Sequence, residues 1–567
     1  MKYYYGLFLL ALLFVFSNNI TAQEAGPRTQ KVEENKYSKI YYVSVSKGSD
    51  TTGNGSISNP WRTITYALSE IKDASQEKQY ALKVSAGKYD EPTIQLKQYV
   101  DIYGGFNGEN WDRDIFTYET VLEGNGKHRI AFGNDNTRID GFTFRGGTVR
   151  GDGGAILCKG VSPVISNNSF RMNKTLGPEN WHPKYWHRQA NDGGAICISD
   201  GAKPVVTNNV FYQNKTVNGR GAGIAINNKS GGKIINNVFL DNVSGLNDPM
   251  RSSDGGAISI YKWCNPLIEN NVIMDNRSLA HNDGGGVWVD LWCSPIIRKN
   301  VFLDNVCSDD AGALFIGGQE HRYARPKDPL PPKRKFYITV DRNIFMGNKN
   351  PWDNSGVIRF TMESRGIFSN NLCVFNNGVY FQRCEAEIVN NTMLENFLLI
   401  ETKKPLKENR VYNNIIWGGI EVTAPAVFSH NDSRESVKGS ENITKDPLLK
   451  NDGFIIYPQS MDYNPFKFIT TAFISGASYK KDALKGRIIK AGNKWGVVKT
   501  SSGPNVEIWG DFSDQTQFEV MPTFGLQGTS PCNRSGMKIQ EITKDVYGHV
   551  WSDNKTGSNE INIGAVK

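Results

Sequence analysis

Residues 283–293 read DGGGVWVDLWC, and residues 254–264, one repeat earlier, read DGGAISIYKWC. Both stretches place Asp-Gly-Gly before alternating apolar residues and close on Trp-Cys. The residues between the shared positions differ, and Tyr261 stands where Asp290 stands in the later copy. A repeated frame with variable positions predicts a scaffold that carries a site on its outer surface.

A second signature, an Asn pair followed by an apolar doublet, recurs at intervals of about 20–43 residues. Its copies and variants are NNSF (167–170), NNVF (208–211), NNVF (236–239), NNVI (270–273), KNVF (299–302), RNIF (342–345), NNLC (370–373), NNTM (390–393) and NNII (413–416). These periods, with short β-rich segments between them, predict a solenoid with one coil per repeat, wound in parallel as a β-helix. Asn tolerates the left-handed backbone of a sharp corner, and stacked Asn side chains can hydrogen-bond along that corner.

The combined GGA[ILV]…FxxN pattern resembles the repeats of extracellular right-handed parallel β-helix proteins. Residues 41–68 are similar to the opening segment of that group, and residues 82–91 resemble its first coil. Four segments near the C-terminus resemble the group's closing segment: DPLL (446–449), FGLQGTSPCNRSG (524–536), KDVYGH (544–549) and INIGAV (561–566). The resemblance implies an all-β, right-handed parallel β-helix. It selects no single function, because the group includes polysaccharide lyases, glycoside hydrolases and adhesin-like passengers.

Four segments are expected along the chain. Residues 1–22 form a signal peptide, since a basic start precedes the short apolar run GLFLLALLFVF and a small residue follows it. A β-helix with an N-terminal cap covers 23–454, a small β insertion covers 455–522, and 523–567 close the helix. The signal peptide predicts a secreted or periplasmic protein that neither spans a membrane nor meets nucleic acid, and we expect a monomer.

Charge and cysteine content leave alternatives open. The formal net charge of +8 fits an acidic partner such as an anionic polysaccharide, yet spread over 567 residues it can also mean little. The eight cysteines form no tight CxxC pair, which argues against zinc. Cys264 and Cys293 occupy equivalent places in adjacent repeats and either stack as small apolar residues or form a disulfide.

Two insertions are expected to leave the coils at a similar corner and to wall a groove. Residues 174–190 carry several aromatic and basic residues together with His187, and residues 318–335 carry His321, Arg322 and a run of cations. The alternative is that each insertion is a solvated loop. Basic and aromatic loops beside a β-helix face favour a ligand, which places the site on coils four to eight.

Strand alternation predicts what lies between those loops. If Ile258, Ile260, Val287, Val289 and Leu291 point inward, the residues between them point outward. The outward set is Tyr261, Trp263, Trp288, Asp290, Trp292, Phe315, Arg359 and, just beyond its strand, Glu363. Exposed Trp and Tyr stack on the apolar faces of sugar rings, so this face predicts carbohydrate binding. Packing of each Trp beneath a loop is the alternative.

Two enzymatic reactions compete. β-Elimination at a uronic acid needs a base, a cation beside the carboxylate and an acid for the leaving oxygen. Tyr261, Lys262, His321 and Arg359 are the catalytic candidates. Trp263, Trp288, Asp290, Trp292, Glu363, His187 and Arg322 are the substrate-binding candidates. Elimination would either cleave a chain or remove water from a terminal uronate, and the excess of basic residues in the two loops favours an acidic polysaccharide or its oligosaccharides.

Hydrolysis instead needs paired carboxylates, for which Asp290 and Glu363 are available with Glu320 in reserve. A non-catalytic carbohydrate-binding or adhesin-like solenoid is the third possibility. Most aspartates of the DGG corners are expected to bond their own backbone. Calcium is a possible cofactor, held by Asp283, Asp309 and Asp310, because it prefers hard oxygen ligands.

Overall fold

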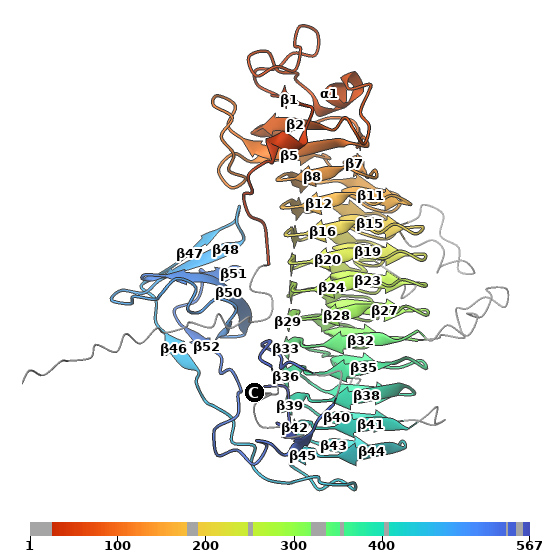
Figure 1. The fold of residues 1–567 in the computed structure, drawn as a ribbon, viewed down its shortest axis with the longest axis vertical. Coiled ribbons are helices and arrows are strands. Elements are labelled where there is room, and N and C mark those ends of the chain that lie inside the picture. The colour runs from red at the N-terminus through yellow and green to blue at the C-terminus, as the bar shows by residue number, and fades with distance from the viewer. Residues whose placement is uncertain are drawn as a thin grey trace, which may run out of the picture.

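The computed structural model describes residues 25–177, 191–247, 253–318, 336–351, 356–401, 408–539, 543–550 and 560–566. These residues wind into a right-handed parallel β-helix, in which each strand pairs with the equivalent strand of the next coil (Figure 1). The fold class predicted from the repeats is therefore confirmed. In the described residues, no helix is long and apolar enough to cross a membrane.

Four stacked parallel sheets, here named A to D, make the faces of the coil in the described residues. Sheet A runs through β1 (Lys39–Val43), β2 (Tyr80–Ser85), β5 (Val100–Phe106), β8 (Arg138–Asp140), β12 (Val164–Ser166), β16 (Val205–Thr207), β20 (Lys233–Ile235), β24 (Leu267–Glu269), β28 (Ile296–Arg298), β32 (Ile338–Asp341), β35 (Arg365–Ser369), β38 (Glu385–Val389), β41 (Asn409–Tyr412) and β44 (Ala426–Ser429). Sheet B runs through β3 (Gly87–Tyr89), β6 (Thr120–Glu123), β9 (Thr143–Arg145), β13 (Ser169–Arg171), β17 (Val210–Tyr212), β21 (Val238–Leu240), β25 (Val272–Met274), β29 (Val301–Leu303), β33 (Ile344–Met346), β36 (Leu372–Val374), β39 (Thr392–Leu394), β42 (Ile415–Trp417) and β45 (Asp432–Ser433).

Sheet C completes the coil. It runs through β4 (Ile94–Gln95), β7 (Ala131–Phe132), β11 (Ile156–Lys159), β15 (Ile196–Ser199), β19 (Ile224–Asn227), β23 (Ile258–Tyr261), β27 (Val287–Asp290), β31 (Leu314–Ile316), β34 (Ile358–Phe360), β37 (Val379–Gln382), β40 (Leu398–Glu401) and β43 (Ile420–Val422). The short sheet D lies between sheets B and C in the middle coils, as β10 (Thr148–Val149), β14 (Lys174–Thr175), β18 (Lys215–Thr216), β22 (Val243–Ser244), β26 (Arg277–Ser278) and β30 (Val306–Cys307).

The inward side chains form one continuous apolar core. Phe170 stacks on Phe211 with ring centroids 4.8 Å apart, and Phe211 stacks on Phe239 at 4.7 Å. These are the aromatic residues of the NNSF and NNVF copies. All eight cysteines are free and buried. Cys264 and Cys293 stack without a disulfide, and the Cys264 amide donates to the Cys293 Sγ at 3.2 Å.

The two residues of each Asn pair have different tasks. The first adopts the left-handed backbone of the corner, as Asn270 does at φ 56°. The second lies inside, where the Asn271 side chain donates to Asn300 Oδ1 and to the Ile234 carbonyl, both at 2.9 Å. The ladder expected from the sequence runs through Asn168, Asn209, Asn237, Asn271, Asn300, Asn343, Asn371, Asn391, Asn414, Asn431 and Asn442.

The N-terminal end of the core is closed by a cap. It contains a short 3-10 helix (Glu34–Lys36) and α1 (Ile64–Glu70). Thr63 begins α1 by accepting from the Tyr66 amide, and Glu91 accepts from the amides of Ile64 and Thr65 at 2.8 Å each. The buried side of α1 covers the first coils, so the apolar stack does not end in water.

A separate antiparallel sheet follows the last coil. It consists of β46 (Phe454–Ile456), β47 (Ser460–Asn464), β48 (Ile469–Phe473), β49 (Ile488–Ala491), β50 (Lys494–Ser502), β51 (Asn505–Trp509) and β52 (Phe518–Val520). The chain then returns to the helix, with β53 (Gly536–Met537) pairing with β54 (Glu560–Ile561). Trp495 and Trp509 are buried against the outer residues of sheet B, so this sheet covers that face. A Cβ at Gly347 would lie 2.3 Å from Trp495 Nε1, which shows how closely the two parts approach.

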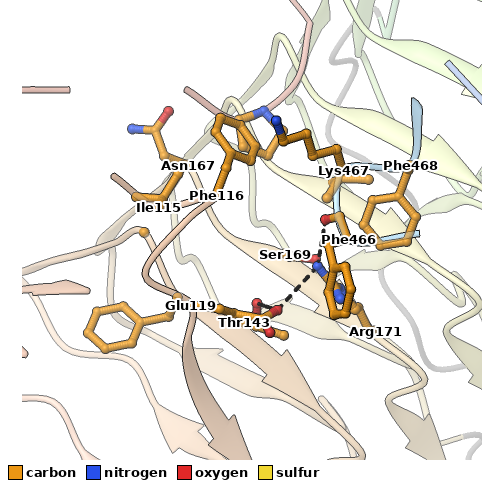
Figure 2. Close-up of a pocket in the computed structure, with 14 residues that line it drawn as sticks. Ile115, Phe116, Glu119, Thr143, Asn167, Ser169, Arg171, Phe466, Lys467 and Phe468 are labelled. Atoms are coloured by element: carbon orange, nitrogen blue, oxygen red, sulfur yellow. Dashed lines mark hydrogen bonds and ion pairs between the residues drawn. The ribbon is translucent and has the colours of Figure 1, made fainter. Parts of the chain in front are cut away.

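A small pocket of about 50 Å³ lies at this seam. Figure 2 shows the residues that line it. Arg171 of sheet B donates to the Phe466 carbonyl at 2.8 Å and pairs with Glu119 at 3.3 Å. Its guanidinium also lies 4.7 Å from the centre of the Phe468 ring. Through these contacts, Arg171 holds the β47–β48 turn against the β-helix. Several residues predicted to form the functional site lie on sheet C, which this antiparallel sheet does not cover in the described residues.

Candidate site on the outer face of sheet C

The register of sheet C aligns the predicted outward residues in two rows. Ser259, Trp288, Phe315 and Arg359 are partners on successive strands and form the first row. Asn227, Tyr261 and Asp290 form the second row. The alternating residues Ile258, Ile260, Val287 and Val289 lie in the core, as expected.

The predicted exposure is wrong for Trp288, Trp292 and Phe315, whereas Tyr261 and Trp263 are partly exposed. Trp288 is 5% exposed, Trp292 4% and Phe315 1%, and Asp290 is also buried at 4%. Trp288 and Phe315 form a small cluster with Ala311, outside the main core. The DGG corners fold over the first row: a Cβ at Gly284 would lie 2.8 Å from the Trp288 Cβ. Bulky residues on this row therefore pack beneath the chain's own corners.

Strand alternation also fails at the ends of the strands. β23 ends at Tyr261 and β27 ends at Asp290. The next residues form left-handed corners, with φ 64° at Lys262 and 66° at Trp263. The equivalent pairs are Leu291–Trp292 and Met362–Glu363. Trp263, Trp292 and Glu363 thus lie at the corner leading to sheet A and not on the flat face, and Leu291 is not part of the main core.

The two corner tryptophans nevertheless meet. Trp263 and Trp292 have ring centroids 4.9 Å apart. Trp263 remains partly exposed, and the buried Nε1 of Trp292 has no hydrogen-bond partner in the part of the chain that the structure describes. The same holds for Ser259 Oγ and Asn227 Oδ1. Buried polar atoms without protein partners are uncommon, and here several lie on neighbouring coils of one face.

The DGG aspartates link successive corners. The amide of Asp192 donates to Asp152 Oδ1 at 2.8 Å, and the amide of Asp310 donates to Asp283 Oδ1 at 3.0 Å. Burial and the charge of Asp192 raise the pKa of Asp152 to about 6. Burial, with Asp254 and Asp310 nearby, also raises the pKa of Asp283. The corner aspartates therefore accept hydrogen bonds from backbone amides. We expected these amides to belong to the same turn, but they belong to the neighbouring coil.

Arg220 stands at the corner position that Asp occupies in the neighbouring repeats, and it is not among the residues predicted from the sequence. Its guanidinium pairs with Asp192 at 2.8 Å and lies 4.0 Å from the centre of the Tyr261 ring. Burial acts to lower the pKa of Arg220, but Asp192, Tyr261 and Asp254 together outweigh it and the pKa is raised. Asn227 also donates to Asp192, at 2.8 Å. The available signal was RGAGI at 220–224, where Arg replaces the Asp of the other corners.

Tyr261 lies between this cation and an acid. Burial raises the pKa of its phenol, the charge of Asp290 acts in the same direction, and Arg220 opposes both. The ring also stacks on Trp288 with centroids 5.6 Å apart. Tyr261 as a whole is partly exposed.

The position of the Asp290 carboxylate requires a glycine in the next coil. A Cβ at Gly317 would lie 2.5 Å from Asp290 Oδ1, so the carboxylate occupies the space that a side chain there would need. At the adjacent Gly318, a Cβ would lie 2.7 Å from the Glu363 carbonyl carbon. Gly317 and Gly318 thus separate Asp290 from Glu363 without placing any side chain between them.

Arg359 is already engaged, because it forms an ion pair with Asp310. Carboxylate oxygens of Asp283, Asp309 and Asp310 lie within 4.8 Å of one another. These are the three residues named as calcium ligands in the sequence-based hypothesis, and carboxylate oxygens suit a hard divalent cation. Of the remaining predicted residues, His187, His321 and Arg322, together with Glu320, lie outside the described residues.

Comparison with known protein families agrees with the β-helix fold. Residues 120–302 match the family model described as right handed beta helix region, so the chain contains such a region. No curated protein matches it. Similar solved structures include the pectate lyase Pel9A, at 10% identity over 97% of this chain and 99% of that chain, with a TM-score of 0.33.

Two further structures are similar at the same level. The GH136 lacto-N-biosidase from Eubacterium ramulus has 13% identity over 72% of this chain and 67% of that chain, with a TM-score of 0.29. The tailspike protein of E. coli bacteriophage HK620, solved with a pentasaccharide, has 11% identity over 88% of this chain and 98% of that chain, with a TM-score of 0.26. Scores this low carry no argument for function.

Proposed function

We propose that this protein is a secreted or periplasmic enzyme that acts on an acidic polysaccharide or its oligosaccharides by β-elimination at a uronic acid. The observation that carries the proposal is the Arg220 guanidinium against the Tyr261 ring on a half-buried, polar face of sheet C. It supplies a cation and a proton-transfer group at one place, which are two requirements of this reaction. The protein acts as a monomer, and nucleic acid is not a partner.

In the proposed step, Tyr261 as phenolate takes the C5 proton of the uronate. The C5–H electron pair forms the C4–C5 double bond and the C4–O bond breaks. The departing oxygen accepts a proton from the Tyr261 hydroxyl, which returns to the phenolate. Arg220 favours the phenolate, because its charge opposes the effects of burial and of Asp290 on the Tyr261 pKa. If the departing group is a sugar the enzyme is a lyase, and if it is hydroxyl from a terminal uronate the enzyme is a dehydratase.

The other predicted residues receive supporting roles in this proposal. Lys262 and the partly exposed Trp263, at the corner beyond Tyr261, contact the sugar next to the reacting one. His187 and Arg322 remain proposed substrate-binding residues and His321 a proposed catalytic residue, and all three lie outside the described residues. Arg359 orients Asp310 and does not act as the base, because its guanidinium is paired. Asp283, Asp309 and Asp310 are the proposed calcium ligands, and calcium there would bind uronate carboxylates.

The experiment follows ultraviolet absorbance of the C4–C5 alkene during incubation with uronate polymers and their pre-cut oligosaccharides. Wild-type protein should produce the signal, Tyr261→Phe should abolish it, and Tyr212→Phe, beneath the C-terminal sheet, should leave it unchanged. A signal on oligosaccharides without chain shortening identifies the dehydratase reaction. Absence of an alkene with every uronate substrate overturns the proposal.

Hydrolysis is a second candidate because Gly317 contacts Asp290 and Gly318 contacts the Glu363 backbone, so no side chain of these two glycines lies between the acidic residues. Paired carboxylates on either side of a glycosidic bond are what glycoside hydrolysis needs. New reducing ends without an alkene, lost in Asp290→Asn and Glu363→Gln, would establish it. Binding of polysaccharide without either product would instead identify a carbohydrate-binding solenoid.

A further inference from the structure

A second cavity lies on the outer face of sheet A, toward the C-terminal coils. Its volume is about 550 Å³, within the range of small-ligand sites. Its lining includes Tyr337 before β32, Arg365 of β35, Glu385 and Glu387 of β38, Arg410 of β41 and Glu408 just before β41. Figure 1 shows β32, β35, β38 and β41 as consecutive rungs of one sheet.

Strand alternation turns these charged side chains outward. Phe368 and Ile388 are core residues of β35 and β38, so Arg365, Glu385 and Glu387 lie on the opposite face. Between the charges, Gly366 and Ala386 are buried and small, and they form the floor of the cavity. A side chain at Gly366 is excluded, because its Cβ would lie 2.2 Å from the Ile338 carbonyl oxygen.

The charges are arranged as two ion pairs between neighbouring rungs. Arg365 Nε lies 3.2 Å from Glu385 Oε2, and Arg410 Nη1 lies 3.4 Å from Glu387 Oε1. These side chains are partly or largely exposed, and ion pairs in water add little to stability. The pairs are therefore not needed to hold the coils together, since the inward core and the Asn ladder already do so.

This pattern of groups suits a ligand rich in hydroxyls. Each guanidinium beside a carboxylate offers donors and acceptors next to one another, which matches neighbouring sugar hydroxyls that both donate and accept. Tyr337, 44% exposed, adds an aromatic face at the rim. The lining holds three carboxylates against two guanidinium groups, so an anionic ligand would be repelled.

We propose that this cavity on sheet A is a binding site for a neutral saccharide, separate from the site proposed on sheet C. The inference does not rest on β-elimination, because a protein without that activity would still present this cavity. Together with the function proposed for sheet C, it assigns acidic sugar to sheet C and neutral sugar to sheet A.

The test is calorimetric titration of the full chain with soluble galactan, arabinan, xylan, mannan and dextran oligosaccharides. At least one should bind, and Tyr337→Ala and Glu387→Gln should each weaken it about tenfold, the effect of losing one stacking or hydrogen-bonding contact. Arg298→Gln is the matched control, since Arg298 pairs with Glu269 at 3.0 Å on the same sheet, outside the cavity.

Tyr261→Phe should leave this binding unchanged, which separates the inference from the function proposed for sheet C. The inference is overturned if none of the five saccharides binds, or if Tyr337→Ala and Glu387→Gln bind as tightly as wild type. It is also overturned if Arg298→Gln weakens binding to the same degree, because the effect would then come from sheet A in general. Circular dichroism of each variant confirms that the coils are intact.

Discussion

The guanidinium carbon of Arg220 lies 4.0 Å from the centre of the Tyr261 ring, although the two residues come from different coils. Arg220 is fixed there by Asp192, which it meets through Nη2 at 2.8 Å and Nε at 3.2 Å. This arrangement sets a positive charge against a phenol whose pKa burial has raised. It leads directly to a pH-dependent prediction.

Replacement of Arg220 by Gln should raise the pKa of Tyr261 further, because the favourable charge beside the phenolate is lost. The pH at which the rate of alkene formation rises should then increase. Arg220→Lys keeps a positive charge and should show a smaller increase than Arg220→Gln. Arg277→Gln, which removes a similarly paired arginine on sheet D, is the control. An unchanged pH profile in Arg220→Gln would exclude Tyr261 as the group that titrates.

Gly317→Ala should displace the Asp290 carboxylate, since the new Cβ would lie 2.5 Å from its Oδ1. We expect a loss of stability of about 1–3 kcal/mol, the usual effect of overpacking. The double variant Asp290→Ala/Gly317→Ala should recover part of it, because the clashing oxygen is gone. Thermal unfolding measures both, with Gly528→Ala as control, since a Cβ there has nothing within 4 Å. Equal melting temperatures for Gly317→Ala and wild type would contradict the geometry.

Asp152 should make stability fall as pH rises from about 4 to about 6. Its pKa is raised to about 6 in the folded protein, against about 3.9 in an unfolded chain, so the folded state holds the proton more tightly in this range. The stabilisation is complete below pH 4 and is lost as pH passes the folded value. Asp152→Asn, which cannot ionise, should flatten this part of the curve, whereas Asp135→Asn should not. Parallel curves for Asp152→Asn and wild type would refute the assignment.

Calcium should raise the melting temperature if Asp283, Asp309 and Asp310 bind it, because a ligand that binds only the folded state stabilises that state. Asp309→Asn should remove the calcium-dependent increase, and chelator should lower the wild-type value to that of the variant. Asp241→Asn is the matched control, because Asp241 is a left-handed corner aspartate outside this group and lies 3.5 Å from Arg277 of β26. No calcium effect on wild-type protein, with no heat of binding in titration, would rule out this group as a calcium site.

The two residues of one Asn pair should respond differently to substitution. Asn271→Ala removes the side chain that donates to Asn300 and Ile234 and accepts from the Asn237 amide. Because several buried groups then lose partners, we expect a cost of about 3–5 kcal/mol. Asn270→Gly should cost little, since glycine adopts φ 56° freely. Melting temperatures test this, and similar losses in the two variants would contradict the division of tasks.

The β-helix, its corners and its Asn ladder could be predicted from the amino-acid sequence alone. These features repeat, and each copy uses local rules: an Asn or Gly where the backbone is left-handed, and period-two alternation between corners. The inward positions Ile258, Ile260, Val287 and Val289 follow from that alternation. The grouping of Asp283, Asp309 and Asp310 was also accessible, because equivalent corner positions in stacked coils must lie close together.

Which outward residues are exposed depends on contacts between coils, and these contacts could not be read from the sequence. Alternation gives the direction of a side chain but not what covers it, and the corners near Gly284 and Ala311 cover Trp288 and Phe315. The alternation also ends after Tyr261 and after Asp290, where two left-handed residues turn the chain toward sheet A. No feature of the sequence pattern marks these strand ends. Arg220 reaches Tyr261 only through stacking of neighbouring coils, so its role follows from contacts between repeats and not from the repeat itself.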